Sequence, residues 1–103
     1  MRILAIERAV TGVTADQFTP ELGVAEARRV WELHQDGPIR ECYFRADEPS
    51  AVLVLECADV VAARDLLAAL PLVSAGLIGF ELVPLRAYPG FARLFAAGTI
   101  EPA

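Results

Sequence analysis

The chain has 103 residues, about the size of one domain, and carries a net charge of −5 at pH 7. This charge, without a basic stripe interleaved with aromatic residues, argues against nucleic acid as a partner. Hydrophobic residues make up 55% of the chain, yet no apolar run reaches the roughly 18–20 residues of a membrane span, so we expect no membrane partner. A soluble chain usually hides such an apolar excess between subunits, so we expect a homodimer or larger homo-oligomer.

We expect one domain over residues 1–103, because no low-complexity tract or long linker interrupts the sequence. Glu7 and Arg8 stand inside what would be the apolar part of a secretion signal, so we expect a cytoplasmic protein. Cys42 and Cys57 have neither the spacing of a CxxC pair nor that of other metal ligands. We therefore expect reduced thiols and no bound metal.

The first predicted element is a strand over residues 1–9. Residues 3–6 are apolar without alternation, which is typical of a central strand covered on both faces. A helix should begin at residues 19–21, where Thr can cap, Pro occupies the first turn and Glu follows. We expect this helix to reach about Gln35, because Gly and Pro at residues 37–38 would end it.

One stripe of this helix is apolar. At ~100° per residue, Trp31 and His34 fall on that stripe, one turn apart, and we expect both to point inward. The remaining members of the stripe are Val24, Ala27 and Val30, and the opposite side carries Arg28, Glu32, Gln35 and Asp36.

Two strands should follow as an antiparallel hairpin, over residues 39–45 and 51–57. If the turn centres on Glu48, Arg40 lies opposite Glu56, and the two form a cross-strand ion pair. The same register puts the two cysteines on opposite faces of the sheet, so we expect no disulfide.

The second half repeats this layout. Asp59 can cap a helix that runs to Leu70, where Pro71 ends it. Residues 77–85 should form a fourth strand, and Pro84 places that strand at an edge of the sheet. The inner face of the second helix is predicted to carry Val60, Ala63, Leu66, Leu67 and Leu70.

The order β-α-β-β-α-β is the ferredoxin-like pattern of an α+β domain, with a four-stranded antiparallel sheet and two helices on one face. The strands lack alternation, so the other face should also be covered, most simply by a second copy in a dimeric α+β barrel. Residues 86–103 form a C-terminal tail with four large apolar side chains: Tyr88, Phe91, Leu94 and Phe95. We expect the tail to pack on a partner subunit or to cover a cavity mouth.

Residues 66–85, LLAALPLVSAGLIGFELVPL, resemble the muconolactone isomerase family. The matching features are the helix that ends in Leu-Pro-Leu, the short connection and the last strand, FELVPL. The first helix fits more loosely. The resemblance implies a small ferredoxin-like subunit in a dimeric barrel, often assembled further. It also implies a proton shift within an unsaturated lactone, without metal or organic cofactor, so we expect no cofactor.

A proton shift needs a group that takes a proton and returns it. Histidine is a residue type suited to this task, which makes His34 a candidate, although a histidine of this kind can instead bond a backbone carbonyl. Glu7, Glu56 and Glu81 are carboxylates in apolar strands, where burial without a cation raises the pKa and makes a usable base. Their alternatives are structural: Glu56 pairs with Arg40, and the other two face solvent.

Binding of a substrate acid also requires a cation to hold its carboxylate and side chains to line the cavity. Arg8, Arg40 and Arg45 are candidates because a guanidinium can bind both oxygens of a carboxylate. Each of them can instead form a structural ion pair. Trp31 and Tyr43 are candidate cavity walls, or simply packing residues.

Three functions remain open at this stage. The first is isomerisation of a small unsaturated lactone or related organic acid. The second is a non-catalytic small-molecule-binding or assembly subunit of the same fold. The third is a cofactor-free monooxygenase-type barrel, or a haem-handling one. A closed pocket that holds His34 with one carboxylate and one arginine within reach favours the first function. A cavity filled by Trp31 and Phe side chains favours the second, and a wide apolar cleft with His34 at its rim favours the third.

Overall fold

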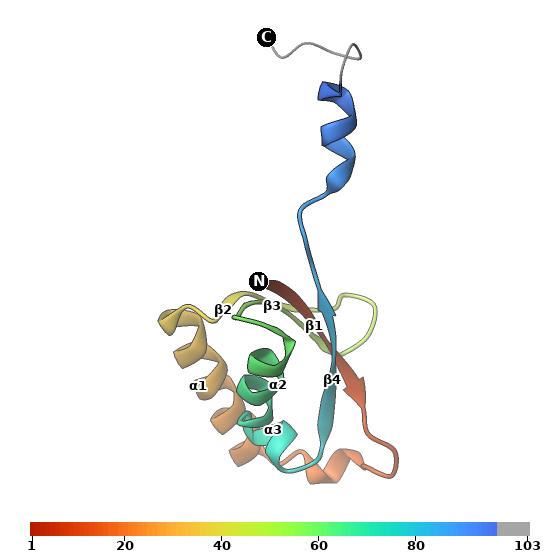
Figure 1. Cartoon of the computed structure of the whole chain (residues 1–103). Helices are drawn as coiled ribbons and strands as arrows, with labels where there is room; N and C mark the ends of the chain where they lie inside the picture. Colours follow the sequence, from red (N-terminus) through yellow and green to blue (C-terminus); the bar gives the residue numbers. More distant parts are fainter. Residues whose placement is uncertain (97–103) are drawn as a thin grey trace.

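The computed structural model describes residues 1–96 and has the predicted order of strands and long helices (Figure 1). It is a ferredoxin-like α+β domain, as expected. The elements are β1 (Arg2–Ala9), α1 (Pro20–Asp36), β2 (Ile39–Phe44), β3 (Ala51–Glu56), α2 (Val60–Ala68), α3 (Pro71–Ser74) and β4 (Ile78–Pro84), with 3₁₀ helices at Ala15–Gln17 and Pro89–Phe95. No helix within residues 1–96 is long and apolar enough to cross a membrane.

The sheet has the strand order β2-β3-β1-β4, and all neighbouring strands are antiparallel. The first strand therefore lies inside the sheet, as its apolar run predicted. β4 lies at an edge, which confirms the position inferred from Pro84, because an edge strand tolerates a missing backbone donor. The second edge is β2, next to α1.

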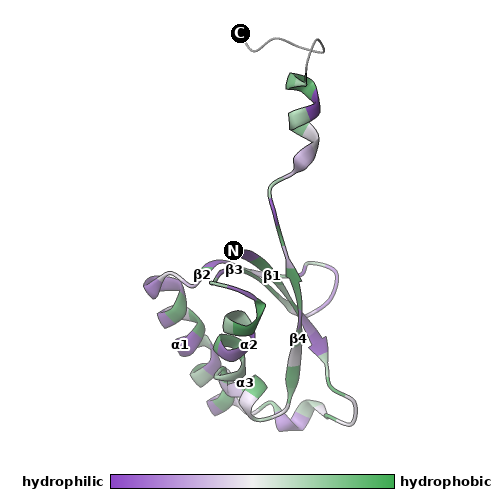
Figure 2. Ribbon diagram, viewed as in Figure 1, coloured by the Kyte–Doolittle hydropathy of each residue, from purple (hydrophilic) through white to green (hydrophobic). Residues whose placement is uncertain are grey.

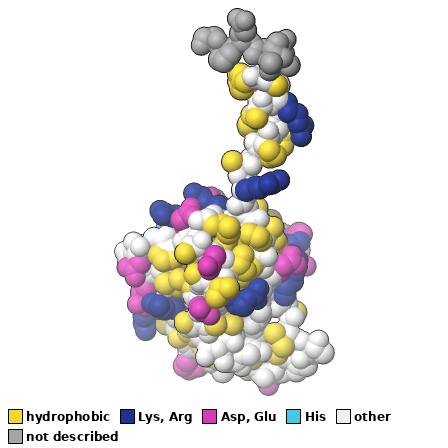
Figure 3. All heavy atoms as spheres, in the orientation of Figure 1, with side chains coloured by type: hydrophobic (Ala, Val, Ile, Leu, Met, Phe, Trp, Pro, Cys, Tyr) yellow, Lys and Arg dark blue, Asp and Glu magenta, His cyan; other side chains and the backbone are white. Residues whose placement is uncertain are grey.

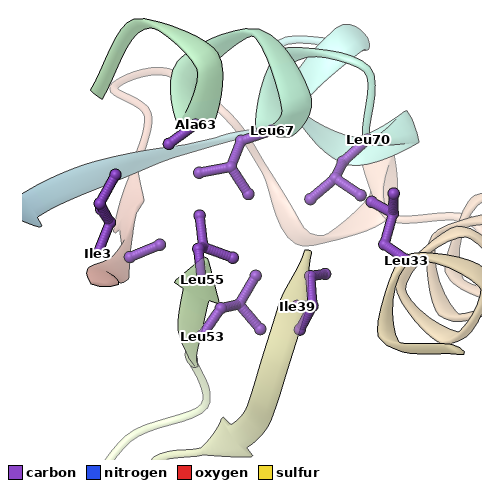
Figure 4. Close-up of a cluster of buried hydrophobic side chains, with 9 residues drawn as sticks. Ile3, Leu33, Ile39, Leu53, Leu55, Ala63, Leu67 and Leu70 are labelled. Atoms are coloured by element: carbon purple, nitrogen blue, oxygen red, sulfur yellow. The ribbon is translucent and has the colours of Figure 1, made fainter. Parts of the chain in front are cut away.

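The hydrophobic core lies between the sheet and the helices (Figure 4). Alternate residues of β1 and β3 point toward α2, so the apolar inner face predicted for the second helix is confirmed at Ala63 and Leu67. The predicted end of this helix is wrong: α2 ends at Ala68, and Leu70 is buried as the residue that precedes α3, which Pro71 begins. The nine buried residues are Ile3, Ala5, Leu33, Ile39, Leu53, Leu55, Ala63, Leu67 and Leu70.

The opposite face of the sheet is apolar in its middle. Leu4 of β1 lies between Val54 and Val83 in the register, and the next residue of that face, Ile6, lies opposite Val52. These side chains are half-buried within one chain, and no helix of residues 1–96 packs over them. Ion pairs border the patch: Arg8 with Glu81 at 2.9 Å, and the Met1 amino group with Glu56 at 2.6 Å.

The stripe of α1 that was predicted to face the core is wrong, because the helix is rotated about its axis relative to that prediction. Leu33 is the one buried residue of α1, whereas Trp31 is 58% exposed and His34 is also exposed. The helix lies along the edge strand β2, so only a narrow strip of its surface, at Val30 and Leu33, packs on the core. Trp31 and His34 stand beside that strip, at an open surface. The start of the helix is as predicted, with Thr19 as its cap.

The predicted hairpin register is also wrong. Glu41 pairs with Val54 and Ile39 pairs with Leu55, so Arg40 occupies a β-bulge between them and opposes no residue. Glu56 instead pairs with the N-terminal amino group and with Arg2, at 3.4 Å. Next to the loop, Phe44 pairs with Ala51 and not with Val52, so the register there already differs by one residue from the prediction. The bulge at Arg40 then shifts it by one residue more.

The Asp59 cap gives a testable prediction for the fold. Its carboxylate accepts a hydrogen bond from the Ala62 backbone at 2.8 Å, as the sequence predicted. Asp59→Ala should lower the free energy of unfolding by about 1 kcal/mol, because the first turn of α2 loses this acceptor. Asp59→Asn keeps an equivalent acceptor and serves as the control in chemical denaturation. Equal losses in the two variants would contradict the capping role.

The segment after β4, residues 85–96, is called the arm from here on. It extends away from the domain and gives the molecule a longest dimension of 62 Å (Figure 1). Apolar residues recur along it (Figure 2). Five of its side chains are large, apolar and exposed: Leu85, Tyr88, Phe91, Leu94 and Phe95. The remainder of the predicted tail, residues 97–103, lies outside the described residues.

Candidate functional site

A groove runs between α1 and the edge strand β2, and we call it the α1–β2 groove. Its volume is about 730 Å³, within the range of small-molecule sites. The groove exists because α1 contacts the core only through the narrow strip at Val30 and Leu33. The neighbouring side of the helix therefore stands apart from β2. Its lining is Gly23, Glu26, Ala27, Val30, Trp31, His34, Arg40, Glu41, Cys42, Tyr43, Phe44 and Leu72.

An inner pocket of about 300 Å³ shares a wall with this groove. Glu26 and Phe44 line both spaces, and Glu7 and Phe80 line the inner one. The inner pocket therefore extends the groove toward the core-facing side of the sheet, where apolar side chains surround two carboxylates.

Glu26 is the half-buried carboxylate of the groove. It projects from α1 and accepts a hydrogen bond from the Leu72 backbone at 3.0 Å, at the start of α3. Burial raises the pKa of the Glu26 carboxyl, and the charge of Glu7 adds to this rise. The bond from Leu72 favours the charged form and opposes the shift. The raised pKa makes the Glu26 carboxylate a stronger base than an ordinary glutamate.

Glu7 lies at the inner end of the same site. It follows Ile3 and Ala5 on the core-facing side of β1, and its Oε1 accepts a hydrogen bond from the Ala51 backbone at 2.9 Å. The sequence singled out Glu7 as a candidate base or a surface residue at a strand end. The structure places it half-buried, facing Glu26 across the inner pocket.

His34 stands at the rim of the groove. Its Nδ1 lies 2.9 Å from the Ile39 carbonyl oxygen, and because a carbonyl only accepts, Nδ1 carries the proton. In the neutral ring Nε2 then keeps a lone pair. Trp31 lies next to it, with ring centroids 6.2 Å apart. The backbone bond foreseen as the structural alternative is therefore present, but at an exposed site and not in the core.

Two further predicted residues line the groove. Arg40 stands on the β2 bulge, which frees its side chain from a regular cross-strand pair. Tyr43 pairs with Val52, so its side chain lies on the face of the sheet away from the helices. There its hydroxyl donates to Glu41 at 2.6 Å, and this bond raises the pKa of Tyr43.

Two predicted residues lie elsewhere. Glu56 is held by the amino terminus and Arg2, at the end of β3 that lies near Arg40. The hydrogen bond from the amino terminus, together with the positive charges of Arg2 and Arg40, lowers the pKa of its carboxyl. Arg8 pairs with Glu81 on the open face of the sheet. Neither Glu56 nor Arg8 lines the groove. The structure therefore brings together His34, Arg40, Trp31, Tyr43 and, through the inner pocket, Glu7.

Sequence reasoning missed Glu26, which it did not single out as a candidate site residue. A signal was present: Glu26 stands four residues after Leu22 and four before Val30, on the strip that continues to Leu33. A carboxylate that interrupts the true apolar strip of a helix points into the interior. The apolar stripe predicted for α1 did not include Glu26, so this signal was not recognised.

The other titratable groups add little to the site. Cys42 lines the groove as a free thiol, and burial raises its pKa, so it favours the unreactive thiol form. Within residues 1–96 no three His, Cys, Asp or Glu side chains lie close enough to hold a metal ion.

The fold and the groove define the class: a ferredoxin-like α+β domain with a ligand-sized space at one edge. Sequence comparison matches no family model and no curated protein. Solved structures do match. Muconolactone isomerase superposes with a TM-score of 0.68 and 22% identity, over 86% of this chain and 92% of that one.

A second match is 5-chloro-2-hydroxyhydroquinone dehydrochlorinase from Burkholderia phenoliruptrix, in complex with 2,5-dihydroxybenzoquinone. It superposes with a TM-score of 0.63 and 14% identity, over 87% of this chain and 98% of that one. This chain therefore has the fold of muconolactone isomerase, and the resemblance read from residues 66–85 is confirmed at the level of the fold.

Proposed function

We propose that the protein catalyses a cofactor-independent proton shift in a small unsaturated lactone or related organic acid. The observation that carries this proposal is Glu26, a half-buried carboxyl with a raised pKa in a ligand-sized groove. The matched structures support the substrate class, since one is named for a lactone and the other for a hydroquinone.

The groove supplies the parts of such a reaction. The Glu26 carboxylate takes a proton from a carbon next to the double bond and returns it to the far carbon, while the double bond moves between them. The proton and electron pair are conserved, so no oxidant or metal enters the balance. Arg40, at the groove, forks onto a substrate carboxylate or onto the oxygen that gains charge. The lone pair of His34 Nε2 offers a second acceptor at the rim.

Glu7 has a supporting role in this proposal. Its negative charge helps to raise the pKa of Glu26, which makes the Glu26 carboxylate a stronger base. Glu26 thus takes the role of proton shuttle for which the sequence had suggested His34, Glu56 or Glu7, and His34 becomes an auxiliary group at the rim.

The monooxygenase-type alternative has one observation in its favour. The groove is open, with His34 at its edge, as that function would require. The monooxygenase-type reaction gives no role to the half-buried Glu26 carboxyl, whereas the proton shift uses it as the base. Dioxygen consumption with a hydroquinone substrate would distinguish the two.

The proposal is tested by nuclear magnetic resonance in deuterium oxide. Muconolactone and a panel of related unsaturated lactone acids are incubated with the protein. The signals of the isomerised product are expected to appear, with deuterium at the carbon that receives the proton where Glu26 exchanges with solvent. Saturable binding with neither isomerised product nor deuterium exchange would instead support the non-catalytic binding subunit. Neither binding nor exchange across the panel would overturn the proposed function.

We also propose that the open face of the sheet binds a second copy, as in a dimeric barrel. The patch of Leu4, Ile6, Val52, Val54 and Val83 supports this, because its ion pairs sit only at the border. Val54→Lys should weaken self-association at least ~10-fold in light scattering, because it places a charge in the apolar centre. Val61→Lys, at a 68% exposed site on α2, is the control. A wild-type monomer at micromolar concentration would contradict this.

A further inference from the structure

We propose that Glu7 and Ser50 form a proton path between the Glu26 carboxyl and solvent, through a cleft that shares no residue with the α1–β2 groove. This rests on the proposed function, because such a path serves a base that exchanges its proton while a ligand covers it. Two observations carry it. Two cavities share Glu7 as a wall, and the buried Ser50 hydroxyl has no hydrogen-bond partner within residues 1–96.

The cleft lies between the end of β1 and the turn that joins β2 to β3, and we call it the hairpin cleft. Its volume is about 380 Å³, far above the roughly 30 Å³ that one water molecule takes in the liquid. Its lining is Glu7, Arg8, Ala9, Glu48, Pro49 and Ser50. Of these residues, only Glu7 also lines the inner pocket that reaches Glu26. The Glu7 carboxylate therefore stands between the two spaces.

The hairpin cleft opens to solvent among charged side chains that already have partners. Exposed Arg8 pairs with Glu81 at 2.9 Å, and exposed Glu48 pairs with Arg45 at 2.7 Å. Figure 3 shows acidic and basic side chains together at the edge of the domain where Figure 1 draws the turn between β2 and β3. Charged groups at a surface stay hydrated, so water is at hand at the mouth of the cleft.

Ser50 supplies the sign of a bound water. It is 9% exposed, and its backbone is fixed by bonds to the Glu48 carbonyl at 2.8 Å and from the Arg45 amide at 2.9 Å. Its hydroxyl nevertheless has no partner among the described residues. Buried hydroxyls nearly always bond a protein group or an ordered water. A water in the hairpin cleft is therefore the expected partner of the Ser50 hydroxyl.

Glu7 is placed to bind the same water. Its Oε1 accepts a hydrogen bond from the Ala51 amide at 2.9 Å, which puts the carboxylate beside the peptide that joins Ser50 to Ala51. An ionised carboxylate accepts up to about four hydrogen bonds, so Glu7 can bind a water on each side besides this one. The order of groups is then Glu26, a water of the inner pocket, Glu7, the water held by Ser50, and solvent.

Transfer along this chain conserves protons. Glu26 gives its proton to the inner water as that water passes one to Glu7, and Glu7 passes one to the cleft water, from which one leaves for solvent. Each member ends as it began, except Glu26, which is again a carboxylate. The Ser50 hydroxyl holds the water and does not ionise. A ligand in the groove covers Glu26 from that side only, so the hairpin cleft stays open.

The path is tested by the deuterium content of the product formed in deuterium oxide. In wild type the proton taken from carbon escapes through Glu7 before it is returned, so the product should carry deuterium. Ser50→Ala, which removes the hydroxyl, and Glu7→Gln, which keeps an oxygen for the Ala51 amide but cannot relay a proton, should lose deuterium and retain protium. The content is expressed per product formed, which corrects for a less active variant.

The matched control is Ser74→Ala, at the only other serine, which is exposed at the end of α3. Its product should carry as much deuterium as that of wild type. Isomerisation with equal deuterium content in all four proteins would overturn the path and leave the proposed function standing.

A second readout needs no turnover. Transfer of magnetisation from water to the protein in nuclear magnetic resonance should show a long-lived water beside the Ala51 amide in wild type and in Ser74→Ala. The signal should be lost in Ser50→Ala. Absence of this water in wild type would overturn the inference, whatever the lactone assay gives. Its presence without isomerisation of any lactone would support the path and overturn the proposed function alone.

Discussion

Glu26→Gln is expected to reduce the rate of the proton shift by about 10²–10⁴-fold, the usual contribution of a positioned general base. The amide keeps the size of the side chain and an oxygen that accepts the Leu72 hydrogen bond, so the groove and α3 should stay in place. The amide cannot take a proton from carbon. Turnover is followed by deuterium entry into the lactone, and the matched control is Glu32→Gln, an exposed glutamate of the same helix.

The pH dependence of the wild type follows from the same shift. Burial raises the pKa of Glu26, so activity should fall as the pH decreases through a value above that of an ordinary glutamate. The folded state also holds this proton more tightly than the unfolded state. Its contribution to stability is therefore present below the unfolded pKa and is lost as the pH rises through the folded one.

Glu26→Gln removes that titration. The free energy of unfolding of the variant, relative to wild type, should thus increase from acidic to neutral pH in denaturant titrations. A variant that keeps wild-type turnover would rule out Glu26 as the base. An unchanged stability difference across the pH range would contradict the shifted pKa.

Leu55→Ala is expected to lower the free energy of unfolding by about 2–5 kcal/mol, a large share of the roughly 5–15 kcal/mol of a typical domain. Leu55 is fully buried on the interior strand β3, and Figure 4 shows it beneath Leu67, between Ile3 and Ile39. Truncation removes apolar contacts and leaves a cavity that the surrounding sheet cannot close.

The measurement is the midpoint of thermal unfolding, which should fall by at least ~8 °C for a domain of this size. Val61→Ala, at the exposed surface of α2, should change stability by no more than about 0.5 kcal/mol. A similar loss in both variants would mean that the core does not centre on β3.

Most of the fold could be predicted from local chemistry. Thr19 and Asp59 cap helices because a short oxygen-bearing side chain satisfies the free backbone donors of a first turn, wherever the helix then packs. Gly37 ends α1 in the left-handed conformation, at φ 110°, which disfavours other residues. Pro84 indicates an edge strand because proline has no backbone N–H to donate to a neighbouring strand.

The site was predicted only in part. Trp31, His34 and Arg40 do meet at one groove, although the expected inward stripe and the expected pairing of Arg40 with Glu56 were both wrong. The bulge at Arg40 is set by how β2 fits against β3, and no single stretch of sequence encodes that fit. Glu26 was missed because its surroundings come from α3 and β1, which lie far from it in sequence.

By itself the sequence determined the order of the strands and long helices, the caps of α1 and α2, the end of α1, and the apolar face of α2, because these depend on neighbours within a few residues. Only the tertiary structure decided the rotation of α1, the register of the hairpin, and which carboxylate is buried. Those features depend on contacts between segments distant in the chain, where a rotation of about 100° or a slip of one residue moves a side chain from the core to the surface.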